Sequence, residues 1–259
     1  MDDILSGDIH IHTCLRPVDD GAQAMSPRFI AEHYRARGMR SFGLSPHVHQ
    51  DADFAALADF LQSAKNIARA MGMEMKAGVE TECTDARGTL TLPSFIAEQL
   101  DYVIASADHF NCAGVVQPPR EAHACMQFHL DLLLTLAAHP LVDVIAHPLA
   151  GMILLTTEGH MPGYEPIERL DDVTDDWVRE FARLARANRT AVELNGYFTL
   201  TYPASLASQG RPSYLDRYLD IYRILAENGV TLVASSDAHT PESLAQYDHA
   251  AKCLRALGA

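Results

Sequence analysis

The stretch that decides the fold is Gly7-Asp8-Ile9-His10-Ile11-His12-Thr13, in which polar and apolar residues alternate. Successive side chains of a β-strand point to opposite faces, so this pattern predicts a strand with Asp8, His10 and His12 on one face and the two isoleucines on the other. Two imidazoles on one face can bind a single metal ion or two adjacent ions. Half-buried strands also carry polar residues without any metal, so this stretch alone leaves both interpretations open.

The composition indicates a globular protein of one domain. The chain has 259 residues, of which 48% are hydrophobic and 21% charged, and this length is typical of a single α/β barrel. A formal net charge of −14 argues against nucleic-acid binding and against anionic membrane surfaces. An acidic protein can still bind a phosphate ester where metal cations supply local positive charge. The thirteen histidines are the unusual feature.

The cysteines and the N-terminal sequence favour a cytoplasmic location. The five cysteines are scattered, with no pair at the spacing of a zinc knuckle or a redox motif, which is typical of reduced thiols. Residues 1–5 lack the basic region and long apolar run of a signal peptide. The most apolar region, 130–155, is interrupted by charged residues, histidines and prolines, so we expect a helix and a strand there and no membrane span.

Apolar strands alternate with amphipathic helices along the whole chain. We expect strands at 7–13, 41–45, 74–79, 102–106, 142–146, 190–195 and 231–235, and helices at 27–37, 53–71, 93–99, 120–138, 175–187, 214–227 and 241–257. This order implies a parallel sheet covered by helices, and a closed barrel of about seven units over 1–259 is favoured. A doubly wound open sheet is the alternative, but no glycine-rich nucleotide motif follows the first strand. We expect long loops at residues 151–173 and 196–212. The first of them is expected to run as an excursion over one face.

Almost every expected strand ends in a potential metal ligand, and in parallel α/β folds these ends share one rim. The candidates are His10, His12, His47, His49, Glu80, His109, His147, Glu193, Asp237 and His239. A catalytic zinc ion usually takes three protein ligands, so this many candidates implies two or three ions. Glu80 is the best-placed bridging carboxylate, and a hydroxide that bridges two ions is a strong nucleophile at neutral pH. Asp8 and Glu193 are expected to support the ligands, and His160 to be a residue of a lid or a plain loop.

These motifs resemble one known family in type and order. Asp8-Ile9-His10-Ile11-His12, Ser45-Pro46-His47, Gly78-Val79-Glu80, Ser106-Ala107-Asp108-His109, Ala146-His147-Pro148 and Ser235-Ser236-Asp237-Ala238-His239 follow one another as in the PHP (polymerase and histidinol phosphatase) family. The resemblance covers nearly the whole chain and is greatest to the stand-alone, histidinol-phosphatase-like members. It implies a distorted (β/α)7 barrel whose two or three metal ions, at the C-terminal ends of the strands, hydrolyse phosphate esters.

Carried over by position, the resemblance implies three sets of metal ligands. The first set is His10, His12, Glu80 and Asp237, the second is Glu80, His109 and His147, and the third is His47, His239 and a residue of the first loop. His47 matches the second motif better than His49. In the first loop Val18 falls near the usual ligand position, so Asp20 is favoured as the third ligand and Asp19 is the alternative.

The predicted function is hydrolysis of a small phosphate monoester, with histidinol phosphate as one candidate substrate. A mixed imidazole and carboxylate set suits zinc, manganese or iron. Asp237 and His239 are the expected catalytic residues, which could protonate the leaving group, and Arg16 and Arg211 are the expected phosphate contacts. One alternative is an amidohydrolase-like enzyme, but these commonly need a lysine at a strand end, and none of the predicted strand ends carries one. The other is a non-catalytic metal-binding module.

Overall fold

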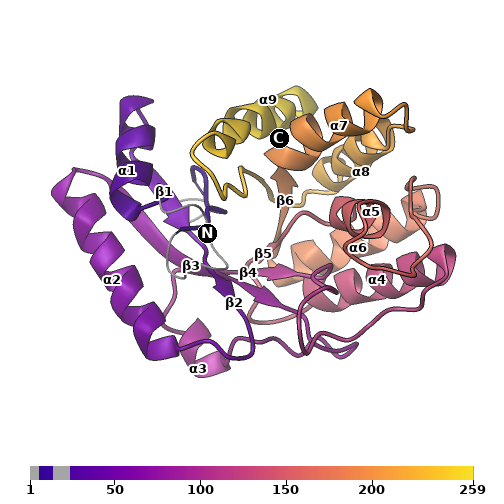
Figure 1. Ribbon diagram of the computed structural model, residues 1–259, viewed down its shortest axis with the longest axis horizontal. Helices are drawn as coiled ribbons and strands as arrows, with labels where there is room; N and C mark the ends of the chain where they lie inside the picture. The colour runs from indigo at the N-terminus through magenta and orange to yellow at the C-terminus, as the bar shows by residue number, and fades with distance from the viewer. Residues whose placement is uncertain (1–5, 14–23, 259) are drawn as a thin grey trace.

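The structure is a computed structural model that describes residues 6–13 and 24–258, and it shows a curled parallel sheet with helices packed around it (Figure 1). The sheet order is β1-β3-β4-β5-β6-β7, β2 pairs with β3, and every pair is parallel. The strands are β1 Ser41–Leu44, β2 His47–Val48, β3 Glu74–Glu82, β4 Tyr102–Ser106, β5 Val144–Ile145, β6 Ala191–Asn195 and β7 Leu232–Ser235. The α/β class with a parallel sheet is therefore confirmed.

Three of the described helices begin at a residue whose side chain caps the helix. Ser26 accepts a hydrogen bond from the backbone N–H of Phe29, and Asp53 and Thr174 cap two further helices in the same way. The helices are α1 Pro27–Ala36, α2 Phe54–Ala70, α3 Ser94–Ala97, α4 Ala122–Ala137, α5 Ala150–Thr157, α6 Asp175–Asn188, α7 Tyr202–Ser208, α8 Leu215–Glu227 and α9 Gln246–Leu257. A π-helix at Tyr197–Thr201 and a 3-10 helix at Ser243–Ala245 precede α7 and α9.

The first segment joins the two edges of the sheet. It was expected to be a regular strand over 7–13, but the structure gives it only an isolated bridge between Ile11 and Ala238. Its backbone divides its hydrogen bonds between β1 on one side and the residues after β7 on the other, so neither side forms a continuous ladder. The bonds are Gly43 N to Asp8 O (2.8 Å), Ser45 N to Ile11 O (3.0 Å), Asp237 N to His10 O (2.8 Å) and His12 N to Ala238 O (3.0 Å).

A small apolar cluster fills the inner side of the sheet. It consists of Ile9, Tyr102, Ile104, Val144, Ala146, Ala191 and Val233. The Tyr102 hydroxyl donates to Ile9 O (2.5 Å) and lies 3.2 Å from Leu44 O, so it ties the first segment to β1. A Cβ atom at Gly43 or Gly78 would come within 2.3 Å of the Tyr102 side chain, which explains why glycine occupies both positions. Two larger clusters lie between the sheet and the helices.

Two segments expected to be loops contain helices. The region 151–173 begins within α5, and 196–212 contains the π-helix and α7. Six of the eight residues of α5 are buried, so this helix has no polar face and no amphipathic period to detect. β3 also continues three residues beyond the expected end at Val79, which places both Glu80 and Glu82 on the strand.

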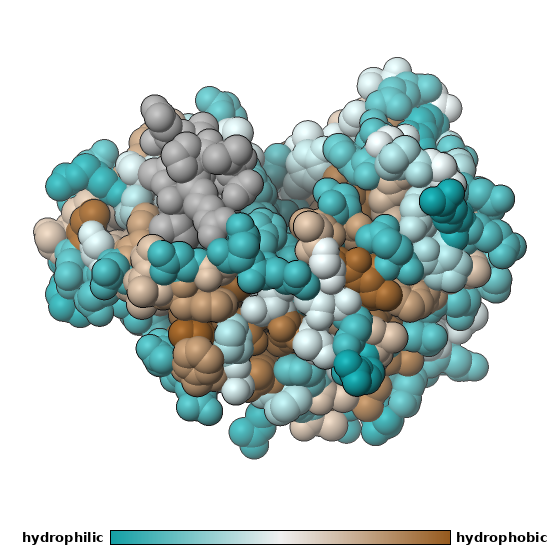
Figure 2. Space-filling model, turned by 60° about the horizontal axis from the view of Figure 1, so that its bottom comes forward, coloured by the Kyte–Doolittle hydropathy of each residue, from teal (hydrophilic) through white to brown (hydrophobic). Residues whose placement is uncertain are grey.

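The described part of the chain contains no helix that is both long and apolar enough to span a membrane. Hydrophilic side chains cover much of the face shown in Figure 2, and hydrophobic side chains form smaller patches among them.

We expect Tyr102→Phe to lower the free energy of unfolding by about 1–3 kcal/mol, because it leaves the buried carbonyl of Ile9 without its hydroxyl donor. Urea denaturation measures the change. Tyr164→Phe is the control, since that hydroxyl contacts Pro118 O where water can replace it, and we expect a smaller loss. Equal losses in the two variants would contradict this role of Tyr102.

Candidate metal centre

Glu80 is the common neighbour of five imidazoles. Its side chain is 1% exposed and projects from the inner face of β3. The Oε2 atom lies 3.3 Å from His10 Nε2, 3.5 Å from His12 Nε2 and 3.0 Å from His47 Nδ1. The Oε1 atom lies 3.2 Å from His147 Nε2 and 3.5 Å from His109 Nε2. Imidazoles from four separate segments therefore converge on one carboxylate.

Asp237, which follows β7, lies beside the same group of imidazoles. Its Oδ1 atom lies 3.0 Å from His12 Nε2 and 3.6 Å from His10 Nε2. Asp237 and His147 have φ angles of 53° and 24°, in a region that residues other than glycine rarely adopt. These turns immediately follow strands β7 and β5 and direct the two side chains into the site. Such strained positions are concentrated at functional sites.

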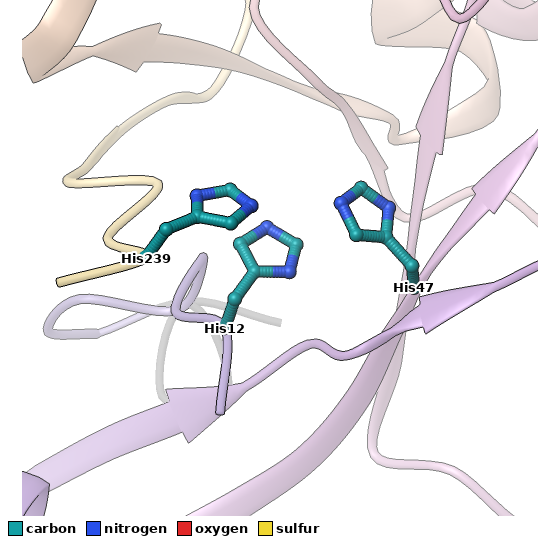
Figure 3. Close-up of side chains that lie close together, drawn as sticks. All are labelled: His12, His47 and His239. Atoms are coloured by element: carbon teal, nitrogen blue, oxygen red, sulfur yellow. The ribbon is translucent and has the colours of Figure 1, made fainter. Parts of the chain in front are cut away.

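Three imidazoles form a second group beside Glu80. Figure 3 shows His12 from the first segment, His47 from β2 and His239 from the residues after β7, whose rings point toward a common space. The ring centroid of His12 lies 4.3 Å from that of His47 and 4.0 Å from that of His239. One ring nitrogen from each lies within 4.8 Å of the others. Asp20, Asp19 and Arg16 lie outside the described residues.

Carboxylates behind the site hold two of the imidazoles in place. Glu193 Oε1 lies 2.6 Å from His10 Nδ1, and Glu193 Oε2 accepts a 2.5 Å hydrogen bond from the backbone N–H of His147. Asp108 Oδ2 lies 3.2 Å from His147 Nδ1, and Ser106 donates to the other oxygen of Asp108. Carboxylates in this position fix the ring orientation and the tautomer of a histidine ligand.

Asp8 serves a different purpose from its neighbours. The expected alternation would place it beside His10 and His12, but its carboxylate accepts hydrogen bonds from the Tyr34 hydroxyl of α1 (2.5 Å) and from Ser236 N (3.1 Å). It therefore anchors the first segment to α1 and to the end of β7. Burial raises the pKa of Asp8 to about 6, in spite of these hydrogen bonds.

The charges within the centre favour ionised carboxylates. Burial raises the pKa of Glu80, but His109, His10 and His47 outweigh burial and hold that pKa well below its usual value. The pKa of Asp237 is lowered in the same way, with His10 as the main opposing group. Burial lowers the pKa of His12 to about 4 and that of His47 well below 6.5, whereas neighbouring carboxylates outweigh burial and raise the pKa of His10 and of His147 well above 6.5. Metal ions bind ionised carboxylates and neutral imidazoles, so metal binding would release the protons of His10 and His147.

The donor atoms of the described residues fit divalent metal ions. His10 Nε2, His47 Nδ1 and Glu80 Oε2 are buried and have no hydrogen bond of ordinary geometry within the described residues. Buried polar atoms nearly always have a partner, and a cation between these atoms would supply one. Nitrogen and oxygen donors in this mixture suit zinc, manganese or iron. These clusters could therefore bind metal ions.

A cavity of about 270 Å³ opens over the centre. Its walls add several residues that sequence reasoning did not assign to the site, namely Asn111, Gly151, Leu154, Leu155 and Phe198, and they also include His160 from the expected excursion. Most of them lie on α5 or the π-helix, the two elements missed in the sequence. Neither lysine nor arginine occurs among the described lining residues. Arg211 pairs with Glu158 (3.2 Å) and Glu168 (3.4 Å), so its role as a phosphate contact stays a prediction.

No family model matches the chain. Among curated proteins, the chain is 30% identical over 247 residues to the DNA polymerase/3'-5' exonuclease PolX of Bacillus subtilis, an alignment that covers 93% of this chain and 35% of the polymerase. It is 23% identical over 247 residues to a probable phosphatase of Acetivibrio thermocellus, covering 95% of this chain and 85% of that protein. A probable phosphatase of Clostridium novyi is 23% identical over 186 residues, and the alignment covers 72% of this chain and 61% of that protein.

The chain therefore spans about a third of the polymerase and most of the Acetivibrio protein. Together these relatives support, at low identity, a PHP-like phosphoesterase family and a hydrolase activity of the phosphoesterase type. A chain in a solved structure, the "cryo-EM structure of archaeal Ribonuclease P with mature tRNA", aligns with a TM-score of 0.47 and 16% identity over 88% of this chain and 83% of that chain. That likeness is too weak to bear on function.

We expect Glu193→Gln to weaken binding of Mn²⁺ to the centre by about 10–100-fold, because it removes the charge that orients and polarises His10. Titration of metal-free protein with Mn²⁺, followed through the paramagnetic resonance of the free ion, measures the affinity. Glu180→Gln on the exposed face of α6 is the matched control and should bind as the unmodified protein does. Unchanged affinity in Glu193→Gln would contradict the supporting role.

Proposed function

We propose that this protein is a metal-dependent phosphoesterase that hydrolyses a small phosphate monoester. The observation that carries the proposal is the position of Glu80, whose two oxygens lie between two groups of imidazoles. The relatives named as probable phosphatases point to the same reaction class. Bound divalent ions would neutralise phosphoryl charge and lower the pKa of a water molecule so that it becomes a nucleophile at neutral pH.

We assign the ligands as the resemblance implies, within a distorted (β/α)7 barrel whose centre lies at the C-terminal ends of the strands. His10, His12, Glu80 and Asp237 would hold one ion, and Glu80, His109 and His147 a second. His47 and His239, with Asp20 from the first loop, would hold a third. The position of His12 between His47 and His239 gives this third group an additional nitrogen donor within reach.

Asp237 and His239 are the residues that we assign to proton transfer toward the leaving group. Both line the cavity, and the side chain of His239 is 44% exposed at its mouth. His239 Nδ1 lies 3.0 Å from the backbone carbonyl of Asp237 and donates to it, so Nε2 is the ring atom that would pass a proton to the leaving group. The lowered pKa of Asp237 keeps its carboxylate ionised, so it would first accept a proton from the attacking water and then return it to the leaving group.

The cavity supports a small anionic substrate. Its volume of about 270 Å³ suits a compact molecule, and Leu154, Leu155 and Phe198 give one side of it an apolar surface. Asn111 and His160 add polar groups at the edge. Because no lysine or arginine occurs among its described lining residues, the charge of a phosphate group would have to be balanced by bound cations. Histidinol phosphate remains one candidate of suitable chemistry.

The similarity to a protein named as a polymerase and 3'-5' exonuclease favours a second candidate, hydrolysis of a phosphodiester at a nucleic-acid end. The net charge of −14 and the lack of basic residues among the described lining residues both oppose it, since tight binding of a polyanion needs basic contacts. An amidohydrolase-like activity is less favoured because it commonly needs a lysine at a strand end. The lysine of β3, Lys76, lies four residues before Glu80, inside the strand and not at its end.

We expect the protein reconstituted with Mn²⁺ or Zn²⁺ to hydrolyse phosphate monoesters, histidinol phosphate among them, faster than a single-stranded oligonucleotide or an amide substrate. Release of inorganic phosphate, nucleotides and amine measures the three activities, and removal of metal by a chelator should abolish turnover. Stoichiometric metal without turnover of any ester would overturn the enzymatic proposal, and faster cleavage of the oligonucleotide would favour the second candidate.

His10→Ala and Glu80→Ala should each lose metal and activity together, because both remove donors from the most buried part of the centre. Metal content by mass spectrometry and phosphate release provide the two measurements. His123→Ala, whose side chain is 67% exposed beside Asp172, is the control and should keep both. Full activity in either of the first two variants would refute this assignment of the site.

A further inference from the structure

A histidine and glutamate pair occurs twice where β2 and the residue after it lie beside β3. His47 is paired in register with Glu80, and Val48 with Thr81. His49, the residue after β2, lies next to Glu82, the last residue of β3, and His49 Nδ1 lies 2.5 Å from Glu82 Oε1. The first pair belongs to the metal centre, whereas the second lies one strand repeat further toward the C-terminal ends.

The segment after β4 also supplies one residue to the centre and one residue beside His49 and Glu82. Cys112 follows His109 in a turn in which Cys112 N donates to His109 O at 2.9 Å. The thiol interacts with the side chains of both His49 and Glu82, and burial is the main reason why the pKa of Cys112 is raised. Each of the three segments thus supplies one residue to the centre and another to an adjacent group, which we call the outer cluster: His49, Glu82 and Cys112.

Among the described residues, the outer cluster contains one buried potential ligand atom without a hydrogen bond, and a second such atom lies beside the cluster. The side chain of Glu82 is 1% exposed, and its Oε2 atom has no hydrogen bond of ordinary geometry within 6–13 and 24–258. His109 Nδ1 is likewise buried without a hydrogen bond in that part of the chain, 3.9 Å from Glu82 Oε1. One donor atom from each of His47, His49 and Glu82 lies within 4.8 Å of the others. The His49 side chain is 27% exposed, so the cluster can be reached from solvent.

We propose that the outer cluster binds a further divalent cation of the zinc type through the His49 imidazole, the Glu82 carboxylate and the Cys112 thiolate. A thiolate among the ligands favours zinc over manganese or magnesium, and three protein ligands leave one position for water. On binding, the Cys112 thiol releases its proton to solvent and the sulfur coordinates the ion. This site is additional to the proposed phosphoesterase centre and requires no substrate.

Cobalt(II) provides a direct test, because thiolate coordination gives a charge-transfer absorption in the near ultraviolet. The described residues that we assign to the centre supply only imidazole and carboxylate donors, so this band would report the outer cluster. We expect titration of metal-free protein with Co²⁺ to produce the band, and Cys112→Ser to abolish it and lower the cobalt content by one ion per chain. Visible ligand-field bands from the centre should persist, which separates failure of this proposal from failure of the centre.

Two control variants address two of the other four thiols. Cys253→Ser removes a thiol that also lies beside a histidine, 3.5 Å from His249 Nε2, and should leave the band unchanged. Cys14→Ser tests the cysteine two residues after His12 and should also leave it unchanged. A second variant, Glu82→Gln, keeps the thiol and should weaken cobalt binding, read at the same band, by roughly tenfold or more.

The proposal is overturned if the unmodified protein gives no charge-transfer band, if the band survives in Cys112→Ser, or if it disappears in Cys14→Ser alone. Unchanged cobalt affinity in Glu82→Gln would overturn it as well. Circular dichroism of each metal-free variant checks folding, and if Cys112→Ser does not fold, Glu82→Gln decides the question alone. The result that supports the proposal is loss of the band in Cys112→Ser with weakened binding in Glu82→Gln.

Discussion

The site depends on keeping the Glu80 carboxylate ionised in the interior. Removing a charge from water is costly unless it is paired and hydrogen-bonded, and Glu80 is 1% exposed. Five imidazole nitrogens lie within 3.5 Å of its two oxygens, and they come from the first segment, β2 and the residues that follow β4 and β5. The position of one carboxylate therefore constrains how at least five segments approach one another.

On the inner face of the strands, apolar residues in the middle of the sheet are followed by buried carboxylates at the C-terminal ends. Ala191 belongs to the inner apolar cluster around Tyr102, and two residues later Glu193 supports His10 and His147. On β3 the sequence runs in the same way from Gly78 against the Tyr102 ring to Glu80 and then Glu82. Each step of two residues therefore moves from apolar packing to buried carboxylates without changing face. The apolar layer holds the strands at the spacing that the carboxylates and imidazoles need.

Much of this arrangement could be predicted because it follows from strand ends. The parallel α/β class, the exact span of β4 and the convergence of the histidines all depend on local patterns. What could not be predicted depends on long-range packing. α5 is apolar all round and shows no period, and the π-helix with α7 follows a strand in a segment rich in turn-forming residues. The outer cluster was also missed, since the pairing of His49 with Glu82 requires the register of β2 on β3 and a strand longer than expected.

The contrast between Asp8 and Glu80 shows why position on a strand does not by itself make a ligand. Both carboxylates are buried, and a period of two would group Asp8 with His10 and His12. Asp8 is surrounded by a hydroxyl and a backbone N–H, so burial dominates and its pKa rises to about 6. Glu80 is surrounded by imidazoles, which outweigh burial and keep its pKa low. The nature of the neighbours, which only the fold determines, thus separates a carboxylate that anchors the chain from one that is ready to hold a cation.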